Sequence, residues 1–367
     1  MTTPLFARLV GSAVGTALLA LPGAALAQSG GTPDVTAYGH LNFGVFSVDD
    51  GTNDDTYLTD NDASNSRVGL IYETGLSNGG RFKFHFETGL GINGSAAVTP
   101  LDNDLDLEWR RTELRKFEVV YTTPRIGTFS FGQGSSATDG VNEADLSGTF
   151  LTNYSSIGDV AFGVEFRDAA GIGSGQSVGD TFNSFDGSRR FRVRYDSPTY
   201  NGFGLSASAG EEILRRGDDR AFYDIALNYD MDYGAVTVAS RIGYQWIDSD
   251  EELLTGSVAL LHEPTGLNAT FATGRQQVGE ADYAYLKLGM TRDLIAAGKT
   301  SIAVDLYEGD DIGFAGSSST AVGFGVVQKL DAYDTEVYAG YRTYDLDGTA
   351  TPVEDIDVAF VGARWKF

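Results

Sequence analysis

Hydrophobic and polar residues alternate with a period of two over much of the chain. Segment 81–90 shows this most clearly, because its phenylalanines share one parity and its charged residues share the other. Successive side chains of a β-strand point to opposite faces, so the alternation predicts a strand with one apolar and one polar face. In this segment Phe82, Phe84 and Phe86 oppose Arg81, Lys83, His85 and Glu87.

About sixteen segments carry this pattern, an even number as bacterial membrane barrels require. No run after residue 27 approaches the ~20 apolar residues that a membrane helix needs. We therefore expect an all-β fold, a transmembrane antiparallel β-barrel closed on itself. A soluble β-sandwich would also alternate, and the strand count and the chain ending separate the two. The expected strands are 34–48, 63–76, 81–93, 107–122, 127–135, 188–197, 202–212, 220–230, 234–247, 252–261, 267–276, 281–291, 300–309, 317–330, 335–345 and 354–367.

The connections between these segments alternate in length. Long acidic stretches such as 49–62, 94–106 and 310–316 alternate with short turns. Short turns at one end of the barrel and long loops at the other are typical of outer-membrane proteins. The short turns are expected at 77–80, 123–126, 199–202, 231–233 and 262–266.

Segment 107–122 departs from the alternation. The pairs Arg110-Arg111 and Arg115-Lys116 place charges on both parities. We expect a β-bulge there, or a strand end that extends beyond the hydrocarbon layer.

The first 27 residues have the features of a secretory signal peptide. Arg8 precedes an apolar run from Leu9 to Leu21, and Ala25-Leu26-Ala27 forms a small-residue cleavage site before Gln28. A transmembrane helix is the alternative, but the run is short and contains glycines. We expect residues 28–367 to form one exported barrel domain.

Charge and cysteine content narrow the class of protein further. The chain has no cysteine, so no disulfide can stabilise the exported fold. Its net charge of −25 becomes −26 once Arg8, the only charged residue of 1–27, is removed. This charge opposes nucleic-acid binding and favours local enrichment of cations. Acidic loops that keep an exposed surface soluble account for part of it.

Five short stretches of the mature chain are distinctive, and the last ends in two aromatic residues on one parity. They are Val35–Leu41, Ser66–Leu70, Gly127–Gly134, Arg192–Pro198 and Val361–Phe367. Together they resemble the general trimeric porins of Gram-negative bacteria, especially the alphaproteobacterial type. The resemblance covers essentially the whole mature chain.

The resemblance implies a sixteen-stranded barrel in the outer membrane. It implies a homotrimer that contacts outer-membrane lipids and lipopolysaccharide, and a third external loop, here residues 136–187, that folds inward and narrows the pore. Asp159 to Arg167 within that loop also reads as a further strand pair, which would change the strand count by two. The last strand resembles the signal read by the outer-membrane assembly machinery, with Trp365 and Phe367 as its aromatic residues.

A porin performs no covalent chemistry, and its function depends on pore width and on the charges that line the pore. The resemblance implies acids on the inward loop opposite bases on the wall, and alternation independently places those bases on the lumen parity. Such an arrangement produces a transverse field that orients dipolar solutes. Alternatively, the bases pair with acids and stabilise the barrel interior. The candidates are Asp139, Glu143 and Asp145 on the loop and Arg67, Arg81, Lys83, Arg190, Arg192 and Arg194 on the wall.

We therefore expect a water-filled channel for passive diffusion of small hydrophilic solutes and ions. A substrate-specific channel, for example for sugars, would need an aromatic slide, for which Tyr338 and Tyr344 are too few. A non-conducting structural or adhesive barrel would show no conductance in a planar bilayer. The sequence contains no G-x-S-x-G, H-E-x-x-H or P-loop motif, so an enzyme is not expected.

One acidic stretch has spacing that partly imitates a calcium loop. Asp102, Asp104 and Asp106 alternate, and carboxylate oxygens suit Ca²⁺. The turn glycine and the distant glutamate of such a loop are missing, so solvated acidic loops are the simpler interpretation. No cofactor is required.

Overall fold

The computed structural model describes residues 32–248 and 251–367, and nearly all of its regular structure is β-strand. The predicted signal peptide, residues 1–27, lies outside the described residues. Short helical turns are η2 (Asp62–Ser64), η3 (Arg111–Glu113), η4 (Ile157–Val160), α2 (Val178–Thr181) and η5 (Asp331–Tyr333). No helix in the described part of the chain is long and apolar enough to cross a membrane.

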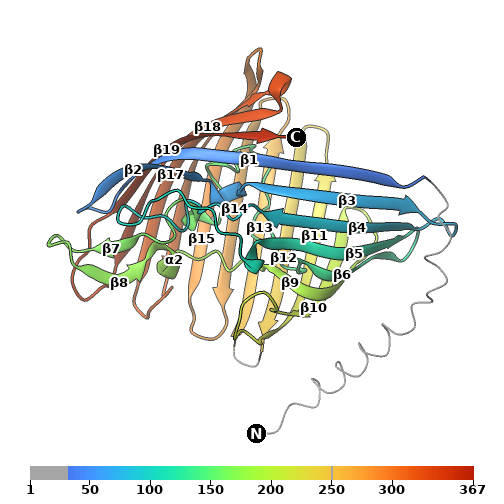
Figure 1. Cartoon of the computed structure of the whole chain (residues 1–367), viewed down its shortest axis with the longest axis horizontal. Helices are drawn as coiled ribbons and strands as arrows, with labels where there is room; N and C mark the ends of the chain where they lie inside the picture. Colours follow the sequence, from blue (N-terminus) through green and yellow to red (C-terminus); the bar gives the residue numbers. More distant parts are fainter. Residues whose placement is uncertain (1–31, 249–250) are drawn as a thin grey trace, which may run out of the picture.

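The strands of the main sheet follow one another around the wall in chain order (Figure 1). They are β1 (Asp34–Asp49), β2 (Asp54–Asp60), β3 (Arg67–Gly75), β4 (Arg81–Gly89), β5 (Leu114–Thr123), β6 (Gly127–Ser135), β9 (Arg189–Asp196), β10 (Phe203–Glu211), β11 (Ala221–Asp232), β12 (Val236–Ile247), β13 (Glu251–His262), β14 (Leu267–Gln276), β15 (Asp282–Ile295), β16 (Gly298–Asp310), β17 (Ser318–Leu330), β18 (Thr335–Asp347) and β19 (Ile356–Lys366).

The sheet closes on itself through antiparallel pairing of the first and last strands. Residues from His40 to Asp49 of β1 pair with β19 along one edge. Along the other edge, β1 pairs with β3 near its start and with β2 near its end. Strands β2 and β3 therefore occupy one position of the wall, and the predicted closed sixteen-stranded antiparallel barrel is confirmed.

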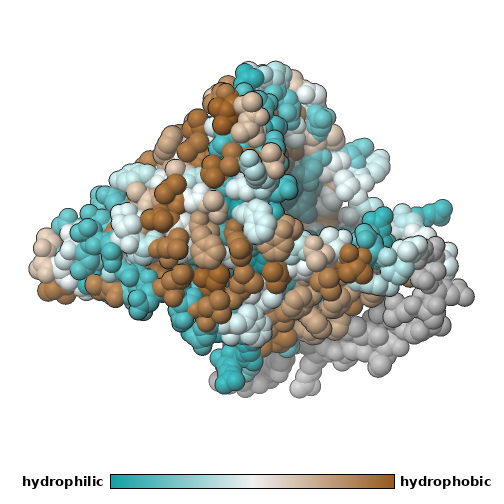
Figure 2. All heavy atoms as spheres, turned by 45° about the horizontal axis from the view of Figure 1, so that its top comes forward, coloured by the Kyte–Doolittle hydropathy of each residue, from teal (hydrophilic) through white to brown (hydrophobic). Residues whose placement is uncertain are grey.

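The two faces of the wall differ in polarity, as the alternation predicts. In β15, Leu286 and Leu288 are exposed, whereas Tyr285 and Lys287, which alternate with them, are buried. The same holds in β16, where Val304 is exposed and its neighbour Asp305 is buried. Figure 2 shows apolar side chains gathered over much of the outer wall on the visible side. Exposed apolar side chains of this kind suit contact with lipid.

Two predicted segments differ from the structure. The acidic loop expected over 49–62 contains β2, so that only 50–53 connects it to β1. The strand expected over 107–122 begins only at Leu114, because residues 107–113 run outside the ladder and include η3. The bulge expected in this strand is present, since Glu87 pairs with Lys116 and Thr88 with Leu114, which leaves Arg115 unpaired in the ladder.

The connection between β6 and β9, residues 136–188, is by far the longest between two wall strands, and we call it the long connection. Part of it forms a separate hairpin of β7 (Glu165–Arg167) and β8 (Gly173–Ser177). The strand pair that Asp159 to Arg167 suggested thus exists in part, but it does not join the wall. Figure 1 shows this hairpin at the same end of the barrel as β2.

The main buried core joins the long connection to the wall. Phe182 of this connection packs against Tyr307 and Tyr344, with ring centroids 5.5 and 5.2 Å apart. Tyr283 stacks on Tyr307 at 5.5 Å, and Phe185 covers Tyr283 at 5.8 Å. Buried aromatic rings contribute large apolar areas, so this cluster holds the second half of the long connection against the wall.

Candidate functional site

The long connection is held by hydrogen bonds to side chains on the buried parity of many wall strands. Its first half contains short polar residues and turns, with positive φ angles at Gly140 and Gly148 that a glycine adopts without strain. The bonds to successive strands are Thr138 Oγ1 to Asp224 Oδ1 (2.7 Å) on β11, Ser257 Oγ to Val141 O (2.5 Å) on β13, Thr291 Oγ1 to Ser147 O (2.5 Å) on β15, Asn153 Nδ2 to Asp305 Oδ2 (2.8 Å) on β16, Ser319 Oγ to Thr181 O (2.8 Å) on β17 and Tyr344 Oη to Ile157 O (2.5 Å) on β18.

Glu143 lies in a group of acidic side chains on the long connection. Burial, and after it the nearby charge of Asp139, raise the pKa of the Glu143 carboxyl to about 7, although the charges of Arg189 and Arg115 act in the opposite direction. Burial and Glu143 likewise raise the pKa of Asp186 well above its ordinary value. These carboxyls therefore share one electrostatic environment with bases of the wall.

The sequence led us to expect Asp145 near the arginines of β9, but its carboxylate pairs elsewhere. Its Oδ1 accepts a hydrogen bond from Lys287 Nζ on β15 at 2.9 Å, and it also accepts one from the backbone of Ser147 at 2.8 Å. Lys287 is 1% exposed and donates its second hydrogen bond to Asn153 O. Asp145 therefore fixes the long connection to a part of the wall remote in sequence from β9.

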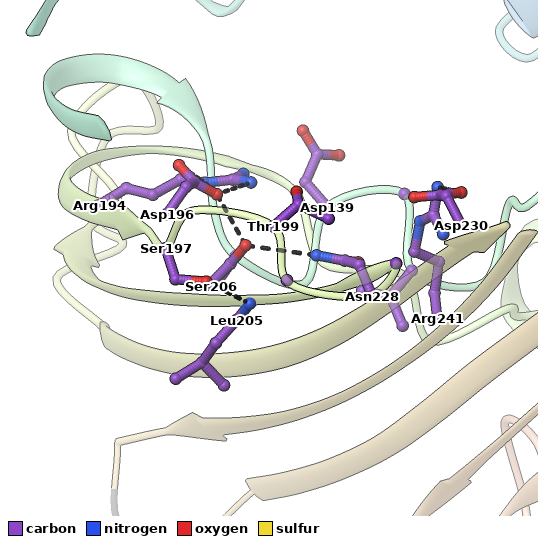
Figure 3. Close-up of a pocket in the computed structure, with 15 residues that line it drawn as sticks. Asp139, Arg194, Asp196, Ser197, Thr199, Leu205, Ser206, Asn228, Asp230 and Arg241 are labelled. Carbon is purple, nitrogen blue, oxygen red and sulfur yellow. Dashed lines mark hydrogen bonds and ion pairs between the residues drawn. The ribbon is translucent and has the colours of Figure 1, made fainter. Parts of the chain in front are cut away.

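Asp139 lies beside a polar cavity of about 340 Å³ between the start of the long connection and strands β9 to β12. Figure 3 shows an Arg194–Asp196 pair at one end of this cavity and an Arg241–Asp230 pair at the other. The Asp139 carboxylate is turned away from both pairs. Among the three predicted loop acids, Asp139 therefore lines the same cavity as one of the predicted wall bases, Arg194.

The three predicted bases of β9 are all paired with acids. Arg192 is 3% exposed and donates from Nη2 to Glu118 Oε2 at 2.6 Å. Arg194 Nη2 lies 2.8 Å from Asp196, and Arg190 Nη1 lies 3.4 Å from Glu212. These contacts fit the alternative that the bases stabilise the interior, most clearly for Arg192.

The remaining predicted wall bases are more varied. Arg67 Nη1 lies 3.7 Å from Glu87, and its Nε donates to Asn65 O at 2.9 Å. Arg81 is largely exposed and pairs with Glu73 at 3.0 Å. Within residues 32–248 and 251–367, Lys83 takes part in no ion pair of 4.0 Å or less.

Sequence reasoning missed several charged groups around the long connection. Arg115 sits at the bulge of β5 and donates from Nε to Glu87 at 2.8 Å. Arg189 is the first residue of β9, where alternation has just begun and gives no reliable direction. Arg342 and Asp305 form an almost fully buried ion pair at 2.8 Å. Alternation places Asp305 opposite Ile302, Val304 and Leu306, and Lys287 alternates with exposed leucines in the same way, so strand parity identifies both as inward-facing but not their partners.

The proposed calcium ligands are not brought together. In the part of the chain that the structure describes, no group of three or more acidic or histidine side chains is arranged to hold a metal ion. The stretch of Asp102, Asp104 and Asp106 instead runs along the exterior, where the backbone carbonyl of Asp104 accepts a hydrogen bond from Asn93. A calcium site on this stretch stays a prediction.

The aromatic residues considered for a sugar slide are not accessible. Tyr338 donates to Asn42 Oδ1 at 2.9 Å, and Tyr344 donates to Ile157 O. Both rings are at most 2% exposed. At the chain end, Trp365 and Phe367 are about half-exposed, with ring centroids 5.1 Å apart. Their role as an assembly signal stays a prediction.

A closed sixteen-stranded barrel with an apolar exterior and buried polar groups inside defines a β-barrel channel of the outer membrane. The chain belongs to the Gram-negative porin family, whose family model matches residues 13–349. The chain thus forms an outer-membrane channel, and this family is not one of enzymes. No curated protein matches the chain.

Solved structures with the same fold come from several Gram-negative bacteria. An anion-selective porin from Comamonas acidovorans is 16% identical, with a TM-score of 0.60, over 92% of this chain and 100% of that one. A loop-deletion form of OmpT from Vibrio cholerae is 14% identical, with the same TM-score and coverage. The channel DcaP of Acinetobacter baumannii is 12% identical, with a TM-score of 0.57, over 93% of this chain and 99% of that one. These similarities show the fold alone.

Proposed function

We propose that the long connection folds into the lumen and forms the constriction of a general diffusion pore. The observation that carries this proposal is the series of hydrogen bonds from Thr138 to Thr181 that reaches inward-parity groups of six wall strands. A sixteen-stranded barrel encloses a lumen wide enough for an aqueous channel, so an unobstructed barrel would be a poor sieve. The long connection would limit passage to small hydrophilic solutes and ions.

The constriction would carry charges of opposite sign on its two sides. Glu143 and Asp139 supply acids on the long connection, and Arg115 and Arg189 supply the bases that act on Glu143 from the wall. The transverse field between them would orient dipolar solutes and disfavour apolar ones. This assignment replaces Arg192, whose guanidinium is buried against Glu118.

We further propose a preference for cations. The net charge of −26 after signal removal and the acidic external loops raise the local concentration of cations. Many inward arginines are neutralised by acids, as in the pairs of Arg192 with Glu118 and Arg342 with Asp305. Reversal potentials in a salt gradient measure this preference, and clear anion selectivity would contradict it.

The assembly would be a homotrimer of the alphaproteobacterial porin type, in contact with outer-membrane lipid and lipopolysaccharide. The trimer form of Vibrio cholerae OmpT has the same fold, at 14% identity and a TM-score of 0.59. Strands β3 to β6 and β9 have 8–10 residues, whereas β15 to β18 have 13–14. The part of the wall with short strands carries the exposed Phe131, whose ring packs edge-on against the half-buried Phe191, and such aromatic residues suit a contact between copies. Cross-linking in detergent tests the trimer.

Deletion of residues 139–146 tests the constriction. We expect the deletion to raise single-channel conductance and the size limit for neutral sugars, because it removes the part of the long connection that crosses between Asp224 and Lys287. A matched control deletes eight residues, 168–175, at the exposed tip of the β7–β8 hairpin. If the first deletion folds and changes neither property, the long connection does not constrict the pore.

A further inference from the structure

A second cavity, of about 630 Å³, lies where the external ends of β11, β12 and β13 meet the second half of the long connection. This volume is within the range of small-molecule sites in proteins. Three inward positions at these strand ends are apolar, namely Phe222, Ile247 and Leu253, whereas inward positions deeper in the same strands are Asp224, Gln245 and Thr255. The cavity therefore has an apolar floor inside an otherwise polar channel.

One end of this cavity carries guanidinium groups. Arg190 stacks on Phe222, with its Cζ 4.0 Å from the ring centroid, and Arg220 approaches the same ring at 5.6 Å. Arg220 donates hydrogen bonds from Nε and Nη2 to the Asp218 carboxylate. Its Nη1 lies 4.0 Å from Glu251, which is beyond hydrogen-bond distance. Arg190 Nη1 donates to Arg189 O at 2.9 Å and lies 3.4 Å from Glu212, whereas its Nη2 donates to no partner among the described residues. Both groups thus retain donors that a carboxylate could accept.

The other end of the cavity carries carboxylates. Asp311 belongs to the connection between β16 and β17, several strands around the wall from Arg190 and Arg220. Its Oδ1 accepts from Gly316 N at 2.6 Å, which holds the carboxylate in place at the lip of the cavity. Asp180 of α2 lines the same end, and Phe314 adds an aromatic ring beside it. Glu251 and Asp186 line the cavity as well, so its two guanidinium groups gather at Phe222 and its carboxylates extend from there to Asp311.

We propose that this cavity binds short zwitterionic solutes with an aromatic side chain, such as small peptides, before they enter the constriction. The carboxylate would meet Arg190 and Arg220, the ammonium would meet Asp311, and the aromatic group would lie on the floor formed by Phe222, Ile247 and Leu253. A plain anion or cation would satisfy only one end and would face the like charge of the other. This inference rests on the proposed passage of solutes through the lumen.

Block of single-channel current by alanyl-phenylalanyl-alanine, added on the side of the external loops, tests the proposal. We expect concentration-dependent block that trialanine, the N-acetylated peptide and the C-terminal amide produce only at higher concentrations. Arg220→Gln should weaken block by roughly tenfold or more, the scale of one charge-assisted hydrogen bond. Arg275→Gln is the matched control, because Arg275 lies on the exposed parity of β14 outside the cavity.

The peptide with a C-terminal amide also tests where the carboxylate of the free peptide binds. If the peptide carboxylate meets Arg220, the amide should bind the wild type and Arg220→Gln equally, since either change removes the same interaction. Asp311→Asn should in turn weaken the free peptide but not its N-acetyl form. Equal block by trialanine, or equal effects of Arg220→Gln and Arg275→Gln, would overturn the site.

Failure of this site is distinguishable from failure of the proposed constriction. A pore whose conductance rises on deletion of 139–146 but that no peptide blocks would retain the constriction and refute the cavity. A pore that the peptide blocks, but whose conductance the deletion leaves unchanged, would retain the cavity and refute the constriction.

Discussion

Lys287 and Asp145 form an ion pair of 2.9 Å that joins the middle of strand β15 to the long connection. The lysine is 1% exposed and the aspartate 12%. Lys287 also donates to Asn153 O, so one ammonium group holds two points of the long connection. Removing one partner of a buried pair leaves an uncompensated charge, which makes this contact a strong determinant of where the long connection lies.

Lys287→Met should lower stability by about 3 kcal/mol, near the lower end for a broken buried pair because Asp145 keeps some exposure. The temperature at which the heat-modifiable band converts in detergent gels measures the loss. Single-channel current should also become noisier, because a less tightly held constriction fluctuates. The double variant with Asp145→Asn should recover part of the loss. Equal stability of wild type and Lys287→Met would refute this role.

Arg189 and Arg192 should respond differently to substitution, although they lie three residues apart. Arg189→Ser should shift the reversal potential towards greater cation preference with little effect on folding, since Arg189 acts on the charge of Glu143. Arg192→Met should chiefly lower the conversion temperature, by the equivalent of about 3 kcal/mol, because the buried Glu118 carboxylate then lacks its arginine partner. Similar effects of both variants on selectivity would contradict this division.

The wall could be predicted from the sequence because one face of each strand contacts lipid and the other faces the lumen, which requires alternating apolar and polar residues. The expected strand 267–276 coincides with β14, where Phe271 faces out between the inward Thr270 and Ala272. Strand β2 was missed because it does not show this alternation. Its sequence, from Asp54 to Asp60, has polar residues on both parities, so it lacks the apolar face that reveals a strand in contact with lipid.

The site was less predictable, because parity gives the face of a residue but not its partner. Alternation placed Arg192 inside correctly, yet its pairing with Glu118 depends on the register of β6 between β5 and β9. The contact of Asp145 with Lys287 joins residues 142 positions apart. No local pattern specifies such a contact, since it depends on the path of the irregular connection through space.

Phe367 provides a test that separates assembly from stability. Its backbone exchanges two hydrogen bonds with Gly39, at 2.9 and 3.0 Å, which any residue could make, while its ring is about half-exposed. Phe367→Ala should therefore reduce the amount of barrel assembled in cells several-fold, yet leave the conversion temperature of the purified protein nearly unchanged. Phe324→Ala, at an exposed ring on β17, is the control and should assemble normally. Normal assembly of Phe367→Ala would remove the signal role.

Selectivity should change with pH because of Glu143. Burial, with the charge of Asp139, raises the pKa of this carboxyl from its ordinary 4.5 to about 7. The folded protein thus binds a proton that the unfolded chain has lost between about pH 4.5 and 7, so this group stabilises the fold at low pH and its contribution falls as pH rises through that window. Above pH 7 the ionised carboxylate adds negative charge to the constriction and should increase cation preference.

Reversal potentials at pH 5.5, 7 and 8.5 would show this change, with values chosen on both sides of the Glu143 pKa of about 7. Glu143→Gln should hold the weaker cation preference of the protonated state throughout, because the amide is neutral at every pH. Asp232→Asn serves as the control, since Asp232 is exposed at the end of β11, outside the long connection, and its loss should not remove a transition near pH 7. Wild-type selectivity that is flat across this range, or a transition that survives in Glu143→Gln, would show that Glu143 does not face the permeation path.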